Sequence, residues 1–287
     1  QMCIRDRYSG MSKELRDFRA QNNFDTYWTN NSFSGMPTYQ LGAKYPHNYI
    51  KQLDLFLRFL PRPADYLFLY FLGFYIFMLS LKVDYRLALF GALSFGFSTY
   101  MIIIIGAGHN AKAHAISYMP FVLASIIYVT QRKYFLGFSL TSIALGLQFT
   151  ANHYQMTYYL GFIVLALAIW FIYRNLNKKN IDHFIKTVFT LLFSLIFALL
   201  MNASNLMTTS EYSNESTRGS YSSLSINPDG SKRKVKNGLS KDYITQWSYG
   251  VFESINLFIP KIMGCLLYTS DAADDSLRVD LGGRRII

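Results

Sequence analysis

Residues 66–81 read YLFLYFLGFYIFMLSL and contain no charged side chain. Such a run is typical of a membrane helix, because charged groups are costly in lipid and a span needs about 20 mostly apolar residues. Including the flanks from Ala64 to Val83 gives a span of 20 residues. We therefore predict that this stretch crosses a bilayer as an α-helix, which satisfies its own backbone hydrogen bonds in lipid.

Five further apolar segments follow, and the polar turns between them are too short to hold soluble domains. The sequence therefore predicts an all-α protein, a polytopic transmembrane helical bundle with six membrane segments within residues 66–201. In the second segment, Ala92 and Gly96 lie four residues apart and offer a small surface that a neighbouring helix can approach closely. The further segments are residues 87–105, 115–130, 134–150, 158–173 and 184–201.

The composition agrees with a membrane protein. Hydrophobic residues make up 51% of the chain and charged residues only 16%, against about 25% charged residues in a typical soluble domain. A formal net charge of +11 would suggest nucleic acid as the partner of a soluble protein. Here the basic residues lie mostly in turns between apolar segments, and no nucleic-acid-binding motif is present. We therefore expect the lipid bilayer as a partner and no nucleic acid.

The basic residues occupy every second turn, which predicts the orientation of the bundle. The positive-inside rule places these turns in the cytoplasm. The other two turns, residues 106–114 and 151–157, carry one lysine between them and face outward. We predict a multi-pass protein of the cytoplasmic (inner) membrane with its polar clusters on the extracytoplasmic side. The basic turns contain Lys82 and Arg86, then Arg132 and Lys133, then Arg174, Lys178 and Lys179.

The polar flanking regions, residues 8–65 and 202–264, belong on the extracytoplasmic side by the same alternation. Part of the first region shows a helical pattern, which predicts a short helix at the membrane interface. A helix packed on its own loop is an equally good interpretation. The apolar positions are Ile50, Leu53, Phe56, Leu57 and Leu60, with Lys51, Asp54 and Arg58 elsewhere.

The two ends of the sequence, residues 1–7 and 265–287, resemble translated sequencing adaptor. Both cysteines, Cys3 and Cys265, lie in these ends. Segments of this kind are excluded from fold reasoning. We expect them to be non-native and the rest to be a fragment of a longer protein, without disulfide or thiol chemistry.

The turn at residues 106–114 reads GAGHNAKAH and holds more polar groups than a connection between two helices needs. His109, Asn110, Lys112 and His114 are candidates for binding a phosphate or pyrophosphate, because they offer N–H donors and a fixed charge. The glycines let backbone N–H groups approach an anion. The alternative is a solvated turn whose charge lies among the lipid headgroups.

A second outward turn, residues 151–156, reads ANHYQM. Asn152, His153 and Gln155 could bind sugar hydroxyls, or they could cap the two helix ends. In the later polar segment, Arg218 suits bidentate binding of a phosphate.

The histidine spacing does not support a metal site. His109 and His114 are five residues apart, which puts them on different faces of a helix. A catalytic zinc needs further ligands, and His153 could join only through the fold. We therefore expect no metal and no cofactor, with a divalent metal possible only where the fold assembles one.

Several phrases of the sequence resemble the YfhO-type bacterial membrane proteins, in the form found in Bacteroidetes. The resemblance covers about residues 8–264. It is most specific in YWTN (27–30) with FSGMPTY (33–39), in GHNAKAH (108–114) and in ANHYQMT (151–157). The phrases are YWTN (27–30) with FSGMPTY (33–39), LPRPADY (60–66), GHNAKAH (108–114), ANHYQMT (151–157) and STRG (216–219).

This resemblance implies a GT-C-like fold and a glycosyltransferase that transfers a sugar from a polyprenyl-phosphate donor to a cell-envelope polymer acceptor. Enzymes of the GT-C type use an acidic residue in the first outer loop as a base or to orient the acceptor. Here that position would fall at or before Tyr8, so the catalytic acid is expected to be missing and stays unknown. Asp17 and Asp25 are the candidates that remain.

Two alternatives to the enzyme stay open. A transporter or flippase of a lipid-linked or anionic substrate would line its path with His109, Lys112, His114 and His153. Transporters often show internal repeats and broken helices near mid-membrane, whereas here no repeat is evident and the polar residues lie in turns. The third hypothesis is a non-catalytic envelope assembly protein whose polar clusters only stabilise the loops.

Overall fold

The structure, a computed structural model, describes residues 10–22, 24–31, 35–45, 47–177, 180–214, 255 and 259. The chain divides into two compact units, one of residues 1–44 and 204–287 and the other of residues 45–203. Almost all regular structure in the described residues is helical, which confirms the predicted fold class at that level. The predictions made for residues 1–7, 265–287 and most of 202–264 lie outside the described residues.

Among its described residues, the first unit contains two helices, a small hairpin and a 3₁₀ turn. Helix α2 (Lys13–Gln21) is joined to the hairpin because Glu14 accepts hydrogen bonds from the Thr29 hydroxyl at 2.6 Å and the Asn30 amide at 2.8 Å. The hairpin pairs β1 (Trp28–Thr29) with β2 (Met36–Pro37), and a 3₁₀ turn (Thr38–Gln40) follows. Helix α11 (Ala203–Asn214) brings Tyr212 to a small core of Leu15, Met36 and Leu41.

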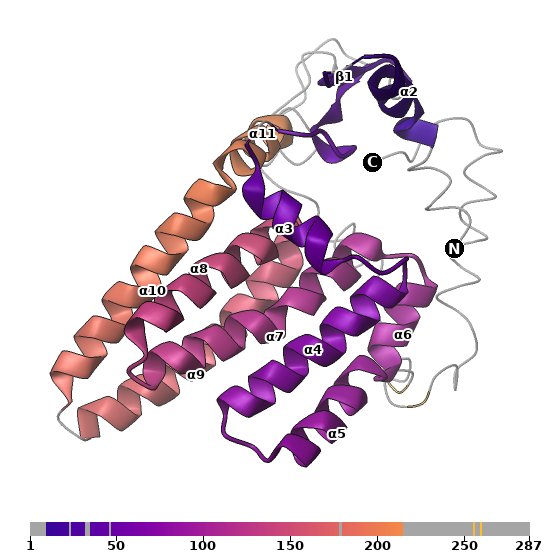
Figure 1. Ribbon diagram of the computed structural model, residues 1–287. Coiled ribbons are helices and arrows are strands. Elements are labelled where there is room, and N and C mark those ends of the chain that lie inside the picture. Colours follow the sequence, from indigo (N-terminus) through magenta and orange to yellow (C-terminus); the bar gives the residue numbers. More distant parts are fainter. Residues whose placement is uncertain are drawn as a thin grey trace, which may run out of the picture. The chain divides into compact units, whose positions relative to one another are not determined.

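The second unit is a helical bundle (Figure 1). All six apolar segments predicted from the sequence are helical, and the second is divided into two helices with a bend of 42° between them. The helices are α3 (Tyr49–Leu57), α4 (Ala64–Ser80), α5 (Tyr85–Gly96), α6 (Thr99–Gly106), α7 (Asn110–Thr130), α8 (Tyr134–Thr150), α9 (Tyr154–Asn177) and α10 (Ile181–Met201).

Within the described residues, three helices are long and apolar enough to cross a membrane: α7, α9 and α10. The bent pair α5 and α6 gives a fourth candidate if it forms one span. Helices α4 and α8 are apolar but have only 17 residues each. The structure thus supports three to four candidate spans, and six spans stay a prediction.

Helix α7 lies at the centre of the bundle. It packs mainly against α4 and α8 and also contacts α6, α9 and α10. Its apolar stretch is 72% buried, against 17% in α9 and α10. At the α4–α5 contact both Ala92 and Gly96 are buried, and a side chain added at Gly96 would meet the Phe71 ring. This confirms the close approach that the small residues predicted.

The three basic turns share one end of the bundle. The side chain of Gln131 donates a hydrogen bond to the Ser80 carbonyl at 2.6 Å, which joins the first and second basic turns. His183, in the first turn of α10, donates from Nε2 to the Thr130 carbonyl at 3.0 Å. Its Nδ1 is therefore an acceptor, and the Tyr134 hydroxyl donates to it at 2.6 Å.

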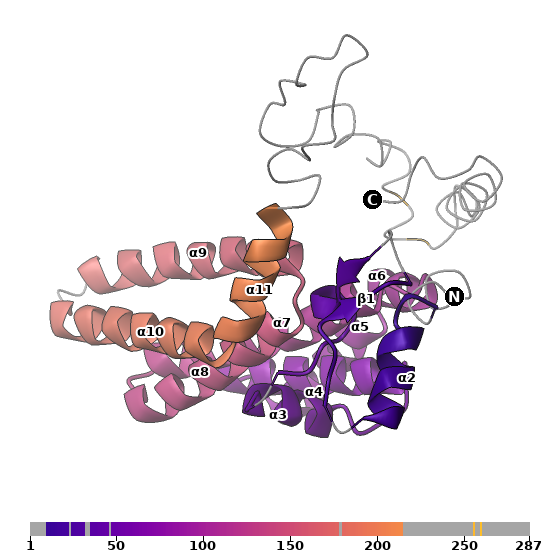
Figure 2. The ribbon, with the colours of Figure 1, turned by 90° about the horizontal axis from the view of Figure 1, so that it is seen from above.

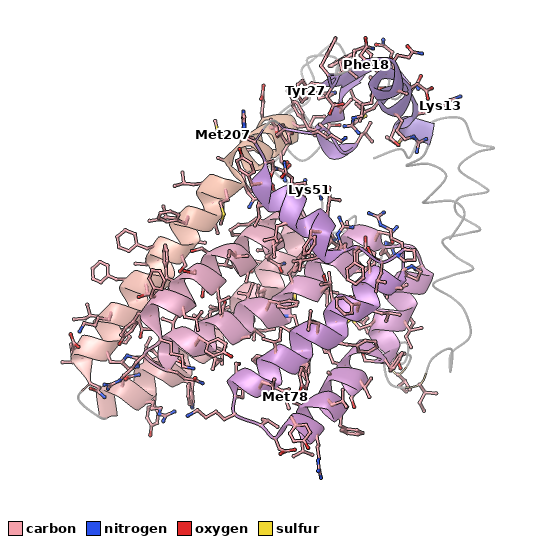
Figure 3. All side chains as sticks on the ribbon, viewed as in Figure 1. Lys13, Phe18, Tyr27, Lys51, Met78 and Met207 are labelled. Atoms are coloured by element: carbon pink, nitrogen blue, oxygen red, sulfur yellow. The ribbon has the colours of Figure 1, made fainter. Side chains whose placement is uncertain are left out.

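The polar turns and α3 lie at the other end. Asn202, after α10, donates to the Gly146 carbonyl at 2.9 Å and thereby fixes the end of α8. Viewed from above, α9 and α10 run side by side (Figure 2). Figure 3 shows Lys51 of α3 and Met78 of α4 at opposite ends of this unit. The separation of basic and histidine-bearing ends agrees with the predicted alternation, whereas the membrane side of each end stays a prediction.

Candidate functional site

The two turns predicted to face outward meet at one end of the bundle. The α6–α7 turn and the α8–α9 turn are held together by an apolar cluster that contains both Ala113 and Ala151. His109 and Lys112 lie within electrostatic range of His153. The structure therefore brings together three of the residues predicted to bind a substrate. We call His109, Lys112 and His153 the histidine rim.

The backbone at the rim suits a tight return of the chain. Gly108 has a φ of 80°, a left-handed conformation that glycine adopts without strain, and it turns the chain into α7. Asn152, with a φ of 51°, does the same before α9. Helices α7 and α9 thus both begin at the rim, where their free N–H groups carry partial positive charge. Such helix starts favour anions.

His153 is a neutral imidazole at this site. Its Nδ1 accepts a hydrogen bond from the Met156 amide at 3.3 Å, so the ring caps the start of α9 and its Nε2 carries the proton. Partial burial lowers the pKa of His153, and the positive charge of Lys112 and the neighbouring His109 lower it further. A ligand with negative charge would reverse the electrostatic part of this shift.

The other predicted residues of these turns lie around the rim. Asn110 is the first residue of α7 and is half-buried, as is Asn152. Gln155 is exposed in the first turn of α9, and its side-chain nitrogen donates to the Tyr159 hydroxyl at 2.7 Å. Their proposed contacts with a phosphate or a sugar stay predictions.

His114 lies apart from the rim, in the interior. It is 6% exposed, and its Nε2 atom lies 2.5 Å from Oδ1 of Asp54 in α3. Its ring also faces Tyr66 and Tyr118, with ring centroids at 5.9 and 5.2 Å. The histidine predicted to contact a substrate therefore has a carboxylate of the protein itself as its hydrogen-bond partner.

Asp54 is the centre of a buried polar cluster. Besides His114, its Oδ1 accepts hydrogen bonds from the Tyr118 hydroxyl at 2.8 Å and from Nε of Arg58 at 3.0 Å. Its Oδ2 accepts from Lys51 and from Arg58, both at 2.8 Å. Arg58 also lies 3.6 Å from Asp65 at the start of α4. We call these six residues the Asp54 cluster, and it fastens α3 to α4 and α7.

Burial by itself would raise the pKa of Asp54, because a carboxylate is poorly solvated in the interior. The hydrogen bond with His114 and the charges of Arg58 and Lys51 outweigh burial, so the pKa of Asp54 lies far below its usual range. A carboxylate held in this way is a poor proton acceptor near neutral pH. Its geometry supports a structural role for Asp54.

The helical pattern separated Asp54 from the apolar positions of α3, but it did not indicate that Asp54 is buried. Asp54 is fully buried, whereas Phe56, one of the apolar positions, is 75% exposed. Of the predicted apolar positions, Ile50 is buried, and it packs with Leu69 of α4, Tyr118 of α7 and Leu147 of α8. The spacing of Lys51, Asp54 and Arg58 already allowed i,i+3 and i,i+4 pairs. No local signal pointed to His114 and Tyr118, which come from a distant helix.

An apolar cavity of about 340 Å³ lies beside the rim. It is lined from α4, α5, α6, α7 and α9, and Met156 and Ile116 join it to the cluster beneath the rim. Pro120 also lines it and has no N–H to donate to the Ile116 carbonyl, a local weakness in α7. The other lining residues are Phe74, Phe77, Phe95, Tyr100, Met101, Met119, Leu123, Tyr159 and Ile163.

The acids considered for catalysis lie in the first unit. Asp25 is paired with Arg19 and accepts a hydrogen bond from the Lys44 amide at 2.8 Å. Partial burial raises the pKa of Asp25, but these partners outweigh it and the net pKa is lowered. Asp17 is exposed on α2. A general base works best with a pKa near the working pH, so the geometry disfavours Asp25, and Asp17 stays a prediction.

Arg218 lies outside the described residues. Among the residues that the structure describes, no three His, Cys, Asp or Glu side chains come together to hold a metal ion. Comparison with known proteins adds no assignment, since no family model, no curated protein and no solved structure matches this chain.

Proposed function

We propose that this chain belongs to a membrane glycosyltransferase that uses a polyprenyl-phosphate-linked sugar and acts on a cell-envelope acceptor at the extracytoplasmic side. The observation that carries the proposal is the histidine rim next to the apolar cavity. His109, Lys112 and His153 offer N–H donors and positive charge for a phosphate. The cavity beside them offers apolar contacts for the first part of an isoprenoid chain.

The two helix starts add to this electrostatic preference. An anion at the rim would meet the N-terminal ends of α7 and α9 as well as the Lys112 ammonium. The rim also lies at the end opposite the basic turns, which is the outward end if the positive-inside rule holds. Lipid-linked sugars are used on that side in the proposed reaction. The general base is left unassigned.

A transporter or flippase is the second candidate, and one observation favours it. The second apolar segment is broken between α5 and α6 with a bend of 42°. Phe95, on one side of the break, and Tyr100 and Met101, on the other, line the apolar cavity. Discontinuous helices beside a cavity are a common feature of transporters. A lipid-linked substrate would fit either activity.

The test measures binding of undecaprenyl phosphate and transfer of sugar separately. Full-length protein and its His109→Ala and Lys112→Ala variants are compared with Lys133→Ala, which removes a charge at the opposite end. We expect weaker binding and slower transfer for the first two variants only. Unchanged binding and transfer in both would exclude the rim from the mechanism. Movement of the labelled lipid across proteoliposomes without sugar transfer would favour the second candidate.

A further inference from the structure

A groove of about 530 Å³ lies between α8 and α10, at the basic end of the bundle. It is separate from the histidine rim and from the cavity beside it, and it is independent of the proposed function. Four phenylalanines and one isoleucine give it an apolar lining, with Tyr134, Lys186 and Thr190 as polar members. The apolar residues are Phe135, Phe138, Ile185, Phe189 and Phe193.

The groove changes from polar to apolar along its length. Tyr134 begins α8, and Lys186 lies in the second turn of α10. Phe193 lies seven residues further along α10, roughly 10 Å deeper at 1.5 Å per residue. A molecule bound here would therefore have a polar head at the basic end and an apolar chain that follows α10. This is the polarity of a membrane lipid.

Charge at this end favours a negative headgroup. Arg132 lies within electrostatic range of Lys186, and Lys133 follows it in the same turn. Lys186 is paired with Asp182 at 2.8 Å, but both side chains are largely exposed, so this pair is weak and can exchange for a phosphate. Basic side chains outnumber acidic ones in the described turns and helix ends at this end of the bundle. The basic residues are Lys82, Arg86, Arg132, Lys133, Arg174 and Lys186, and the acidic residues are Asp84 and Asp182.

We propose that the α8–α10 groove is a binding site for one anionic phospholipid. The phosphate lies near Lys186 and Arg132, and an acyl chain packs between Phe138 and Phe193. Basic pockets between membrane helices commonly bind acidic lipids in this way. A second copy of the chain is a poorer occupant, because a symmetric contact here would bring Lys186 and Arg132 of both copies together.

The test is native mass spectrometry of the full chain in mild detergent with added phosphatidylglycerol or phosphatidylcholine. We expect one phosphatidylglycerol to be retained in preference to phosphatidylcholine. The double variant Lys186→Gln with Arg132→Gln should weaken this binding by about fivefold per charge removed, from about 1 kcal/mol for each basic residue. Arg86→Gln removes a charge at the same end of the bundle but away from the groove, so it should leave the binding of phosphatidylglycerol unchanged.

A second pair of variants tests the apolar part of the site. Ile185→Trp adds bulk within the groove, whereas Leu192→Trp adds the same bulk on an exposed part of α10 that does not line it. Only the first should displace the lipid. Equal retention of the two lipids, equal effects of the groove and control variants, or a dimer that Ile185→Trp dissociates would overturn the proposal.

Discussion

The Nε2 atom of His114 lies 2.5 Å from Oδ1 of Asp54, and this contact joins two residues 60 positions apart. It connects the short helix α3 to the central helix α7. Since Asp54 also accepts from Tyr118, Arg58 and Lys51, one buried carboxylate organises the contact of α3 with the bundle. Two of the predictions below follow from this arrangement.

Asp54→Asn should destabilise the protein strongly. The substitution removes the negative charge that compensates Arg58 and Lys51, and removal of one partner from a buried ion pair typically costs about 3–5 kcal/mol. Asp182→Asn is the matched control, because Asp182 forms an exposed pair with Lys186 and should change stability by less than about 1 kcal/mol. Thermal unfolding in detergent compares the two. Similar melting temperatures for both variants would contradict a central role of Asp54.

The contribution of Asp54 should not depend on pH near neutrality. Its pKa in the folded protein lies below the ordinary value of 3.8. The stabilisation is therefore complete above about pH 4 and is lost only as the pH falls from that value towards the folded pKa. The difference in melting temperature between wild type and Asp54→Asn should be constant from pH 8 to pH 5. A difference that shrinks within that interval would show that the carboxylate is less well paired.

His153 should titrate below its ordinary pKa of 6.5. Lys112→Gln removes one of the positive charges that lower this pKa, so the midpoint should rise towards 6.5 without reaching it, because burial remains. Nuclear magnetic resonance of the ring protons measures the midpoint, and Lys133→Gln, at the far end, serves as the control. Addition of undecaprenyl phosphate should raise the midpoint of the wild type. If the midpoint of His153 were unchanged in Lys112→Gln, Lys112 would not lie close enough to His153 to affect its pKa, and the histidine rim would be contradicted.

Labelling of single cysteines tests the sidedness. In a chain with Cys3 and Cys265 replaced by serine, Lys112→Cys should react with a membrane-impermeant maleimide added to intact cells. Arg132→Cys should react only after the membrane is permeabilised, because the positive-inside rule retains that turn in the cytoplasm. The opposite pattern would place the histidine rim inside and remove the basis for an extracytoplasmic reaction.

The helices were predictable because their signal is local. Each apolar segment carries its own hydrophobicity, and each turn its own polar residues, so the positions of the six segments agree with the helices that the structure describes. The break between α5 and α6 was not predicted. Residues 87–105 carry no charged side chain, and the interruption at Phe97 and Ser98 has no proline to signal it.

The histidine rim was predictable in part. The sequence indicated two polar turns on the same side, and the structure places His109, Lys112 and His153 near one another. It could not indicate that His114, in the same motif, belongs to a different cluster. Position 114 lies within α7, so its side chain points where the helix directs it rather than where the turn lies.

The sequence by itself determined the helical class, the positions of the apolar segments and the alternation of basic and histidine-bearing turns, because hydrophobicity and charge are properties of neighbouring residues. Only the tertiary structure decided which charges are buried. In the sequence Asp54 lies between Leu53 and Leu55, with Lys51 and Arg58 one helical turn away, yet its partners His114 and Tyr118 lie on a helix that begins more than 50 residues later. A buried charge is stable only with partners that compensate its desolvation, and packing alone brings those partners together.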